Sequence, residues 1–331
     1  MQQLLAQDAK RYSTFRLAAT LSNVIEISSV ADLQAYHPKQ PPLILGEGSN
    51  CIFLTDWRTD VMRFVATDII QDVHGDILHL HVSAGCNWHH LVETTVKQGW
   101  WGLENLALIP GSVGAAPVQN IGAYGVEMAD ICSYVDFFSW GTRTIERLTR
   151  EQCAFGYRDS IFKTALAGKG VIVAVGFKLK RNGVAHLSYK GLDHLSQDPS
   201  PSVVMQAVMA VRQSKLPDPT SLANCGSFFK NPVLDAALFQ TLVQQYPAIP
   251  NYPQPDQYVK VAAAWLIEQV GLKGYQIGDI GCYPLQPLVL VNYGSGSSEQ
   301  LIELVHLIQQ SVKDKFAIHL EPEVRLLAQY D

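Results

Sequence analysis

An α+β fold of two or three domains is predicted by three features of the sequence. The chain has 331 residues, of which 47% are hydrophobic and 17% charged, and this is enough to fill more than one hydrophobic core. A buried strand over residues 42–45 enters a glycine turn and leaves it through a second strand over 51–54, not through a helix. The two prolines of segment 215–219 end a helix and mark a linker.

The part of the chain before the linker is predicted to mix strands with single helices. Residues 24–60 alternate short strands with one helix whose N-cap is Ser29, with Asp32 three residues on. From residue 65 the sequence becomes strand-rich, and its one clear helix, over 87–98, stops at Gly99. Four side chains share the buried face of that helix: Trp88, Leu91, Val92 and Thr95.

A third, compact α/β unit is predicted after the linker. A helix over 202–214 precedes the linker, and a helix over 259–270 follows it. Ser297 and Gln300 have the spacing of a capping box at the start of a long helix. A last strand is expected over 317–328.

The segment 109–125, Ile-Pro-Gly-Ser-Val-Gly-Ala-Ala-Pro-Val-Gln-Asn-Ile-Gly-Ala-Tyr-Gly, has the composition of a ligand-binding loop. It holds four glycines and two prolines and no charged residue. Glycine lets the main chain approach a bulky group closely, and the absence of charge indicates that backbone N–H groups meet that group. An ordinary surface loop would be richer in Ser, Asn and Asp. We predict that this glycine loop binds a pyrophosphate.

The turn between the strands over 42–45 and 51–54, Gly-Glu-Gly-Ser-Asn, indicates which kind of nucleotide site is present. A Rossmann fingerprint requires G-x-G-x-x-G at the start of a helix, and here both the third glycine and the helix are missing. A doubly wound NAD domain is therefore not expected. The remaining prediction is a flavin-type site in which two separate loops supply backbone donors to one dinucleotide.

Charge and composition exclude several other classes of protein. The net charge is −5 and no dense basic run occurs, which argues against a nucleic-acid or anionic-membrane partner. The N-terminus has no apolar signal region and the longest apolar run, 171–175, has the length of a strand, so we predict a cytoplasmic protein. The six cysteines lack a C-x-x-C pair, and His89, His90 and Glu93 lack metal-site spacing, so free thiols and no metal are expected.

Three later motifs complete a family pattern. They are Phe-Gly-Tyr-Arg-Asp-Ser at 155–160, Asn-Cys-Gly-Ser-Phe-Phe-Lys-Asn-Pro at 224–232 and Leu-Glu-Pro-Glu-Val-Arg at 320–325. Together with the two glycine segments, and in this order, they resemble the flavoprotein family UDP-N-acetylenolpyruvoylglucosamine reductase from about residue 14 to residue 327.

The resemblance implies a fold and a division of the chain. The fold is an FAD-binding fold of the PCMH or vanillyl-alcohol-oxidase type in two subdomains, with a third α/β domain for the substrate. The implied subdomains are 1–65 and 66–214, the second including a C-terminal strand at 319–331. The implied substrate domain is 215–318.

The resemblance also implies an activity. NADPH would reduce noncovalently bound FAD, and the enolpyruvyl double bond of UDP-N-acetylglucosamine enolpyruvate would then be reduced to give UDP-N-acetylmuramate for peptidoglycan synthesis. Hydride would reach substrate C3 and a proton would reach C2. The enzyme would be a cytoplasmic monomer without nucleic-acid or membrane partners.

This chemistry points to three catalytic residues. A guanidinium can hold the charge that develops on the substrate carboxylate, so Arg158 is the natural clamp. Glu323 can assist only as a protonated acid, a form that a dry, apolar site favours. The resemblance assigns proton donation to the hydroxyl of Ser227. Glu321 is the rival of Glu323 if the register is shifted, and Cys225, where the family usually has alanine, is interpreted as a small hydrophobe.

The remaining site residues are assigned by the same resemblance. FAD contacts are expected at Gly46, Gly48, Ser49, Asn50, Gly85, Pro110, Gly111, Ser112, Gly114, Ala115, Asn120, Gly122, Ala123, Tyr124 and Gly125. UDP-sugar contacts are expected at Tyr157, Tyr189, Lys215, Asn231, Tyr252, Lys273 and Gln286. Tyr189 resembles the family's mobile tyrosine, which closes over substrate, whereas Lys273 alone would be interpreted as a lysine complementing a helix dipole.

Two other functions fit parts of the pattern. An FAD-dependent oxidase of the same fold, acting on an alcohol or sugar, would consume oxygen and often holds its flavin covalently through histidine. A non-catalytic UDP-sugar binding protein would be colourless when purified. The reductase interpretation predicts releasable yellow FAD and NADPH oxidation that depends on the enolpyruvyl substrate.

Overall fold

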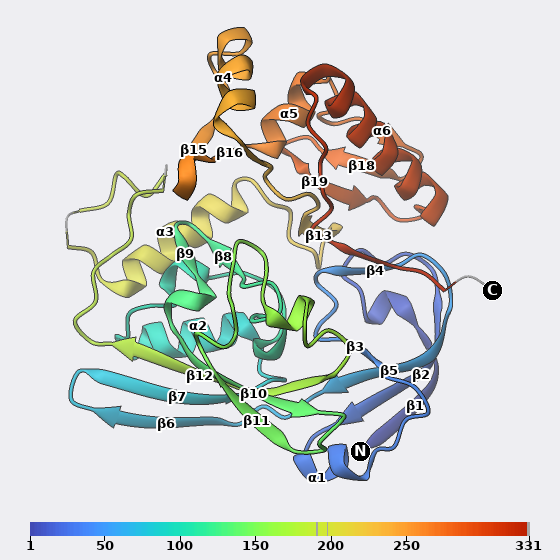
Figure 1. The fold of residues 1–331 in the computed structure, drawn as a ribbon, viewed down its shortest axis with the longest axis vertical. Coiled ribbons are helices and arrows are strands. Elements are labelled where there is room, and N and C mark those ends of the chain that lie inside the picture. Colours follow the sequence, from blue (N-terminus) through green and yellow to red (C-terminus); the bar gives the residue numbers. More distant parts are fainter. Residues whose placement is uncertain (190, 197, 330–331) are drawn as a thin grey trace. The chain divides into compact units, whose positions relative to one another are not determined.

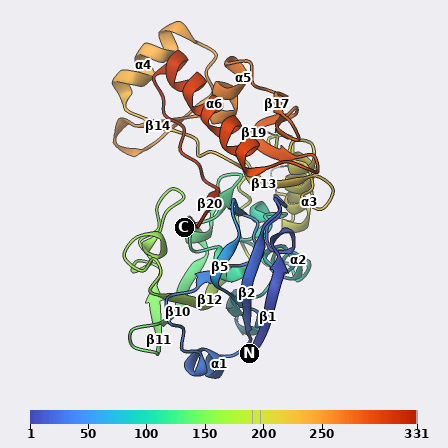
Figure 2. The ribbon, with the colours of Figure 1, turned by 90° about the vertical axis from the view of Figure 1, so that its right-hand side faces the viewer.

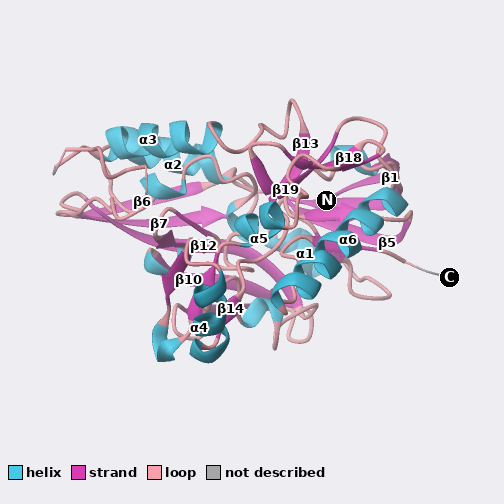
Figure 3. Ribbon diagram, turned by 90° about the horizontal axis from the view of Figure 1, so that it is seen from above, coloured by secondary structure: helices cyan, strands magenta, loops and turns pink. Residues whose placement is uncertain are grey.

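The computed structural model describes residues 1–189, 191–196 and 198–329, and its chain forms two compact units. Unit 1 is made of residues 1–7, 21–47 and 58–214, and unit 2 is made of 8–20, 48–57 and the chain from 215 onward. Both units contain helices and strands, which confirms the predicted α+β class (Figures 1 and 3). The three-domain division at residues 65 and 214 stays a prediction.

Unit 1 is built on two sheets. The four-stranded sheet has the order β1 (Gln2–Asp8), β2 (Thr20–Ile27), β5 (Trp57–Phe64) and β3 (Leu43–Ile44). The five-stranded antiparallel sheet has the order β11 (Ile145–Thr149), β10 (Cys132–Ser139), β12 (Gly170–Lys180), β7 (Ile77–Ser83) and β6 (Ile69–His74). A short hairpin of β8 (Gly122–Ala123) and β9 (Val126–Glu127) lies within the glycine loop and just after it.

The predicted helix starts of unit 1 follow from side-chain caps. Helix α1 (Val30–Ala35) begins after Ser29, whose hydroxyl accepts a hydrogen bond from the Asp32 N–H at 3.1 Å. Helix α2 (Trp88–Lys97) begins after Asn87, whose side-chain oxygen accepts a hydrogen bond from the His90 N–H at 2.9 Å. Both predictions are confirmed, and the predicted helix over 202–214 is α3 (Pro201–Gln213).

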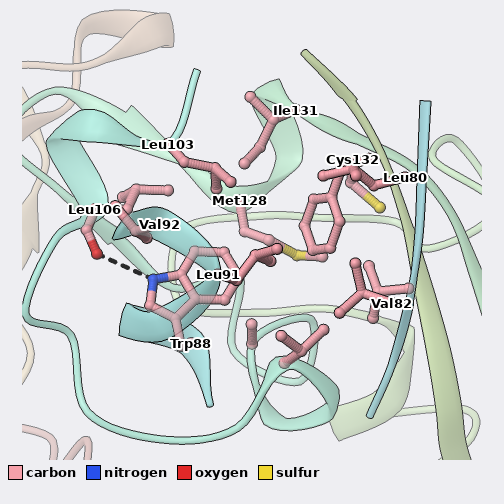
Figure 4. Close-up of a cluster of buried hydrophobic side chains, with 14 of the residues drawn as sticks. Leu80, Val82, Trp88, Leu91, Val92, Leu103, Leu106, Met128, Ile131 and Cys132 are labelled. Atoms are coloured by element: carbon pink, nitrogen blue, oxygen red, sulfur yellow. Dashed lines mark hydrogen bonds between the residues drawn. The ribbon is translucent and has the colours of Figure 1, made fainter. Parts of the chain in front are cut away.

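Helices α2 and α3 cover one face of the five-stranded sheet (Figure 1). Their apolar side chains join those of β7 and β12 in the main core of unit 1. Figure 4 shows Trp88 in this core, where its indole Nε1 donates to the Leu106 carbonyl at 3.0 Å. The indole is fully buried, and its one polar atom is satisfied.

Unit 2 is built on a four-stranded sheet with the order β13 (Ala223–Ser227), β19 (Gln286–Asn292), β18 (Ile280–Tyr283) and β17 (Gln276–Ile277). Its smaller sheets are β14 (Val233–Leu234), β16 (Val259–Val261) and β15 (Asn251–Pro253), and the parallel pair β20 (Arg325–Leu327) and β4 (Cys51–Phe53). The helices are α4 (Ala236–Gln245), α5 (Ala263–Gln269) and α6 (Ser298–Phe316). Helices α5 and α6 share one core with the four-stranded sheet (Figure 2).

The turn-to-strand prediction at the first glycine turn is confirmed, since β3 enters that turn and β4 leaves it. The capping box predicted before α6 is also confirmed, because both Ser297 and Gln300 hydrogen bond as it requires. Short 3₁₀ helices complete the structure: Ala9–Arg11, Glu104–Leu106, Val113–Ala115, Met128–Asp130, Ile161–Lys163 and Pro255–Gln257.

Two predicted elements of unit 2 are wrong in extent. The helix expected over 259–270 begins only at Ala263, because Val259–Val261 pairs as the central strand β16 between β14 and β15. The strand expected over 317–328 is only Arg325–Leu327. Ala317 ends α6 in the left-handed conformation, with φ 57°, and residues 318–324 form only an isolated bridge at Pro322.

In the described part of the chain, every helix is too short or too polar to cross a lipid bilayer. The apolar run 171–175 lies in strand β12, as predicted. All six cysteines are buried free thiols.

Candidate active site

Gly46 of the first glycine turn and Gly114 of the glycine loop (residues 109–125) each lie too close to a neighbouring residue of unit 1 for a side chain. A methyl group added to Gly46 would lie 2.7 Å from the Ser112 hydroxyl oxygen. A methyl group added to Gly114 would collide with Ala84, whose carbonyl accepts a hydrogen bond from the Gly114 N–H at 2.8 Å. Both glycines are therefore needed for close approach of the backbone.

The central part of the glycine loop uses its backbone donors within the protein. The N–H groups of residues 113–116, 118, 120 and 121 all donate to carbonyls of the protein. Within the described ranges, the N–H groups of Gly111 and Ser112 have no such acceptor. These two adjacent donors at the start of the loop are available to a phosphate, and the predicted cofactor contacts along the rest of the loop stay a prediction.

A small cavity of about 100 Å³ lies next to this turn. Its lining is Leu45, Gly46, Glu47, Arg63, Phe64, Val65, Gly85 and Ser112. Three residues predicted to contact FAD are in this lining: Gly46, Gly85 and Ser112. A side chain on Gly85 would meet the Ala66 carbonyl oxygen at 2.6 Å, so this wall can be built only of backbone. The glycine-lined cavity and the two donors beside it fit part of a dinucleotide.

Asn120 links the glycine loop to the segment that carries Arg158. Its side chain is 1% exposed and makes three hydrogen bonds. The amide nitrogen Nδ2 donates to Glu127 Oε2 at 2.7 Å and to the Gly156 carbonyl at 3.0 Å, and Oδ1 accepts from the Ala129 N–H at 2.9 Å. This buried polar network fixes the two segments relative to each other.

Arg158 lies against the glycine loop. One of its terminal nitrogens donates to the Gly122 carbonyl at 2.8 Å, and its guanidinium carbon lies 5.4 Å from the centre of the Tyr157 ring. Three non-glycine residues around this point have positive φ: Asn120 (43°), Tyr124 (53°) and Arg158 (54°). Such backbone strain persists only where the surroundings enforce it, and it is concentrated at functional sites.

Tyr124, which is predicted to contact the cofactor, touches Tyr189, which is predicted to contact the substrate. Their ring centroids are 4.7 Å apart at an angle of 72°. Burial raises the pKa of Tyr124 to about 12, and a hydrogen bond from Arg212 acts in the opposite direction. Burial also lowers the pKa of Arg212, which lies near both tyrosines. The sequence analysis did not identify Arg212, because its only sequence signal is a position near the end of a predicted helix.

Asn105 is a second residue that the sequence analysis did not identify. Its side chain is fully buried, and its amide nitrogen donates to the carbonyls of Tyr124 and His186, both at 2.9 Å. His186 begins the short segment that leads to Tyr189. Asn105 therefore positions the backbone on either side of the tyrosine pair.

Ser227 stands at the end of strand β13 in unit 2, after a β-bulge. The register of β13 against β19 shifts between Asn224 and Ser227, and Gly226 has φ 68°. The space around Gly226 is open, so glycine is needed there for its conformation. The bulge leaves the side chain of Ser227 exposed, as a proton donor to a bound substrate requires.

Glu323 lies in the segment next to the one that carries Ser227. The Glu323 N–H donates to the carbonyl of Phe228 at 2.8 Å. Its rival, Glu321, is exposed and forms an ion pair with Lys230 at 2.6 Å. Glu323 is partly buried, so of the two carboxyl groups it has the drier surroundings.

The second half of the first glycine turn belongs to unit 2 and touches the Glu323 segment. The amide nitrogen of Asn50 donates to the Glu323 carbonyl at 3.1 Å, and the Arg325 N–H donates to the Asn50 carbonyl at 3.0 Å. Gly48 has φ 73°, and a side chain there would collide with the Tyr12 carbonyl. Hydrogen bonds in unit 2 therefore connect Asn50, predicted to contact the cofactor, with the segment that carries the predicted catalytic residue Glu323.

The predicted UDP-sugar contacts of unit 2 are mostly at the surface. Lys215 is exposed and Tyr252 is 45% exposed. Lys273 forms an ion pair with Glu268 of α5 at 2.8 Å. Asn231 accepts a hydrogen bond from the first N–H of α5 at 2.9 Å, and Gln286, partly exposed, begins β19.

Cys225 has the character of a small buried hydrophobe. Its sulfur lies 3.5 Å from the Thr14 hydroxyl, and burial raises its pKa to about 12. A thiol with this pKa stays protonated at neutral pH and is a poor nucleophile.

The structure thus brings the predicted residues together in two groups. In unit 1 these are Gly46, Gly85, residues 110–125, Tyr157, Arg158 and Tyr189. In unit 2 these are Gly48, Ser49, Asn50, Lys215, Ser227, Asn231, Tyr252, Lys273, Gln286 and Glu323.

Comparison with known families gives two matches along the chain. Residues 17–148 match the FAD binding domain, which confirms the prediction of FAD. Residues 218–327 match the C-terminal domain of UDP-N-acetylenolpyruvoylglucosamine reductase. Tyr157, Arg158 and Tyr189 lie between the two matched regions.

Full-length relatives cover the whole site. The UDP-N-acetylenolpyruvoylglucosamine reductase of Pasteurella multocida is 46% identical over 329 residues, which is 97% of this chain and 96% of the relative. The enzyme of the same name from Escherichia coli K12 is 49% identical over 291 residues, 87% of this chain and 84% of the relative. The crystal structure of the Thermus caldophilus reductase shares the fold, with a TM-score of 0.70, 24% identity and coverage of 99% of this chain and 98% of that one.

Proposed function

Because the chain belongs to the UDP-N-acetylenolpyruvoylglucosamine reductase family, we propose that it reduces the enolpyruvyl group of UDP-N-acetylglucosamine enolpyruvate to give UDP-N-acetylmuramate. FAD is the cofactor and NADPH is the reductant. The observation that carries the proposal is 46% identity over 97% of the chain to a reductase of that name.

Bound FAD supplies the two-electron transfer from NADPH to the substrate double bond. The Gly111 and Ser112 N–H groups and the glycine-lined cavity would hold part of it, and Ser49 and Asn50 are also expected to contact it. These residues need no charge of their own, because backbone donors and amides suffice for a phosphate.

Arg158 holds the substrate carboxylate. Reduction at C3 places negative charge on C2 and on this carboxylate, and a permanently cationic guanidinium stabilises that charge. The hydrogen bond to the Gly122 carbonyl and the Asn120 network keep the guanidinium in one orientation, so little reorganisation is needed during the reaction.

Ser227 delivers the proton to C2. A hydroxyl is a weak acid, but a carbanionic carbon is a strong base, and the bulge presents the hydroxyl outward from β13. Glu323 in its protonated form supports the same charge on the substrate. Its partial burial and the hydrogen bonding of its backbone to Phe228 and Asn50 support this role.

The diphosphate and uracil of the substrate require cations, amides and an aromatic surface. We assign these to Lys215, Lys273, Asn231, Gln286, Tyr252, Tyr157 and Tyr189. To act on a phosphate, Lys273 must exchange its ion pair with Glu268 for the substrate. We extend the proposal to a monomer in the cytoplasm, where its reductant NADPH is found.

The test is a steady-state assay with the purified yellow protein. NADPH oxidation should depend on added UDP-N-acetylglucosamine enolpyruvate, and UDP-N-acetylmuramate should form in equal amount, as measured by mass spectrometry. Oxygen consumption with an alcohol or sugar and no turnover of the enolpyruvyl substrate would show an oxidase instead. A colourless protein that binds UDP-sugar without turnover would contradict both enzyme functions.

A further inference from the structure

Asn224 is a buried amide at the start of the β-bulge that precedes Ser227 in unit 2. It is 4% exposed, and its side chain makes three hydrogen bonds. Oδ1 accepts from the Gly226 N–H at 2.9 Å. Nδ2 donates to the Leu222 carbonyl at 2.8 Å and to the Pro217 carbonyl at 3.1 Å. A buried amide bonded in this way has one fixed orientation, because any other would leave polar groups unpaired.

The hydrogen bond between Gly226 and Asn224 fixes the shape of the bulge. A side-chain oxygen that accepts from the N–H two residues further on closes an Asx turn. Glycine adopts several backbone conformations at little cost, and the space around Gly226 is open. Its φ of 68° therefore has to be held by bonding, and the Asn224 side chain supplies a bond that does so.

The bulge is also held on both sides by the backbone. Before it, the Asn224 N–H donates to the Thr14 carbonyl at 3.1 Å. After it, the Phe228 N–H donates to the Leu288 carbonyl of β19 at 2.8 Å. With both ends fixed, the conformation at Gly226 determines where the Ser227 hydroxyl points.

We propose that Asn224 is a positioning residue for the proton transfer, and that it aims the Ser227 hydroxyl through its hydrogen bond to Gly226. The inference rests on the proposed function, in which Ser227 gives the proton to substrate C2. A general acid must lie within reach of the atom that it protonates, so a small displacement of this hydroxyl slows the step strongly. Asn224 itself takes no part in the chemistry.

The test measures the two half-reactions of the full-length yellow holoenzyme by anaerobic stopped flow. In Asn224→Ala, reduction of the flavin by NADPH should stay within about twofold of the original rate. Reoxidation by UDP-N-acetylglucosamine enolpyruvate should slow about 10-fold to 100-fold, the expected result of misplacing a reacting group by about 1 Å. An unchanged reoxidation rate would overturn the proposal.

A double-variant cycle shows whether Asn224 acts through Ser227. In Ser227→Ala no hydroxyl remains to be aimed, so adding Asn224→Ala should slow reoxidation by less than about a further twofold. If the second substitution slows reoxidation as much in Ser227→Ala as in the original protein, Asn224 acts on the reaction by another route and the proposal fails.

Asn292→Ala is the matched control for loss of structure. Asn292 is also a buried amide of unit 2, 3% exposed. Its Oδ1 accepts from the Gly294 N–H at 3.0 Å, and its Nδ2 donates to the Phe15 carbonyl at 3.1 Å. Both alanine variants should lower the midpoint of urea unfolding, but Asn292→Ala should change the ratio of the two half-reaction rates by less than about twofold. Equal slowing of reoxidation in both variants would contradict a positioning role.

A conservative variant tests the bond to Gly226 itself. Asn224→Asp keeps an oxygen that can accept from the Gly226 N–H, so its reoxidation should be at least about threefold faster than that of Asn224→Ala. Equal rates would show that this bond is not what aims Ser227. If Asn224→Ala does not fold, Asn224→Leu, which keeps the shape of the amide without its hydrogen bonds, replaces it in the cycle. If the substrate does not reoxidise the original protein, the proposed function fails instead.

Discussion

In unit 1 the proposed site residues are fixed by buried hydrogen bonds and by contacts between backbones, whereas in unit 2 several side chains assigned to the UDP-sugar are exposed. Asn120 makes three hydrogen bonds at 1% exposure, while Tyr252 is 45% exposed and Lys273 is tied only to a surface carboxylate. A cofactor that stays bound can be matched by rigid backbone. A substrate that must enter and leave is met by side chains that can exchange partners.

The largest expected effect on the reaction is at Ser227, which follows the β-bulge at Gly226 in unit 2. Ser227→Ala should leave reduction of the flavin by NADPH near normal and slow reoxidation by the substrate about 10²-fold to 10⁴-fold, the typical contribution of a general acid. Stopped-flow measurement of the two half-reactions checks this. Cys225→Ala, two residues away and buried without a chemical role, is the matched control and should keep both rates. An unchanged reoxidation rate in Ser227→Ala would sink the assignment.

The largest expected effect on folding is in the backbone contacts of unit 1. Gly114→Ala places a methyl group into Ala84 and should destabilise the protein by about 2–4 kcal/mol, as overpacking of a tight contact does. Denaturant unfolding measures the change. Gly141→Ala, on an exposed turn with no neighbour nearer than 3.8 Å, should stay within about 0.5 kcal/mol. Equal effects at the two glycines would contradict the close-packed description of unit 1.

The next prediction tests whether the buried hydrogen bonds of Asn120 stabilise unit 1 and hold Arg158 in place. Asn120→Ala removes the buried hydrogen bonds to Glu127, the Gly156 carbonyl and the Ala129 N–H, so a loss of about 2–3 kcal/mol is expected. Because the network holds Arg158, kcat should fall more than KM rises. Asn182→Ala removes one exposed hydrogen bond to Asp76 and should change stability by less than about 0.5 kcal/mol. A tolerated Asn120→Ala with normal kcat would show that this network does not hold Arg158.

The smallest effect on stability is expected at Lys273. Lys273→Ala should change the free energy of unfolding by less than about 0.5 kcal/mol, because its ion pair with Glu268 is exposed, while KM for the UDP-sugar should rise about tenfold. Glu268→Gln breaks the same ion pair and keeps the lysine, so its KM should not rise. If both variants raise KM alike, the ion pair and not the lysine is responsible.

Helix starts that depend on nearby capping residues could be predicted from the sequence. Ser29 and the capping box of Ser297 with Gln300 were sufficient to place the starts of α1 and α6. The prediction at 259–270 failed where tertiary pairing overrode helix periodicity, since β16 is held between two strands from elsewhere in unit 2. The strand expected over 317–328 failed because a run of apolar residues does not reveal which of them find a partner strand.

The residues that sequence reasoning missed all depend on distant partners. Asn105 donates to carbonyls 19 and 81 residues away, and Arg212 hydrogen bonds to Tyr124 in the glycine loop. No local spacing records such contacts. Motifs identified Arg158, Ser227 and Glu323 as candidates, but the bulge at Gly226 and the hydrogen bond between Glu323 and Phe228 could only come from the fold.

The central claim is tested most directly by an anaerobic experiment on one sample. The purified yellow protein is reduced with one equivalent of NADPH, UDP-N-acetylglucosamine enolpyruvate is added, and flavin absorbance is followed. The account predicts that NADPH bleaches the flavin and that the substrate restores its colour as UDP-N-acetylmuramate forms. A flavin that NADPH bleaches but only oxygen recolours would contradict the proposed substrate while leaving the fold and the cofactor in place.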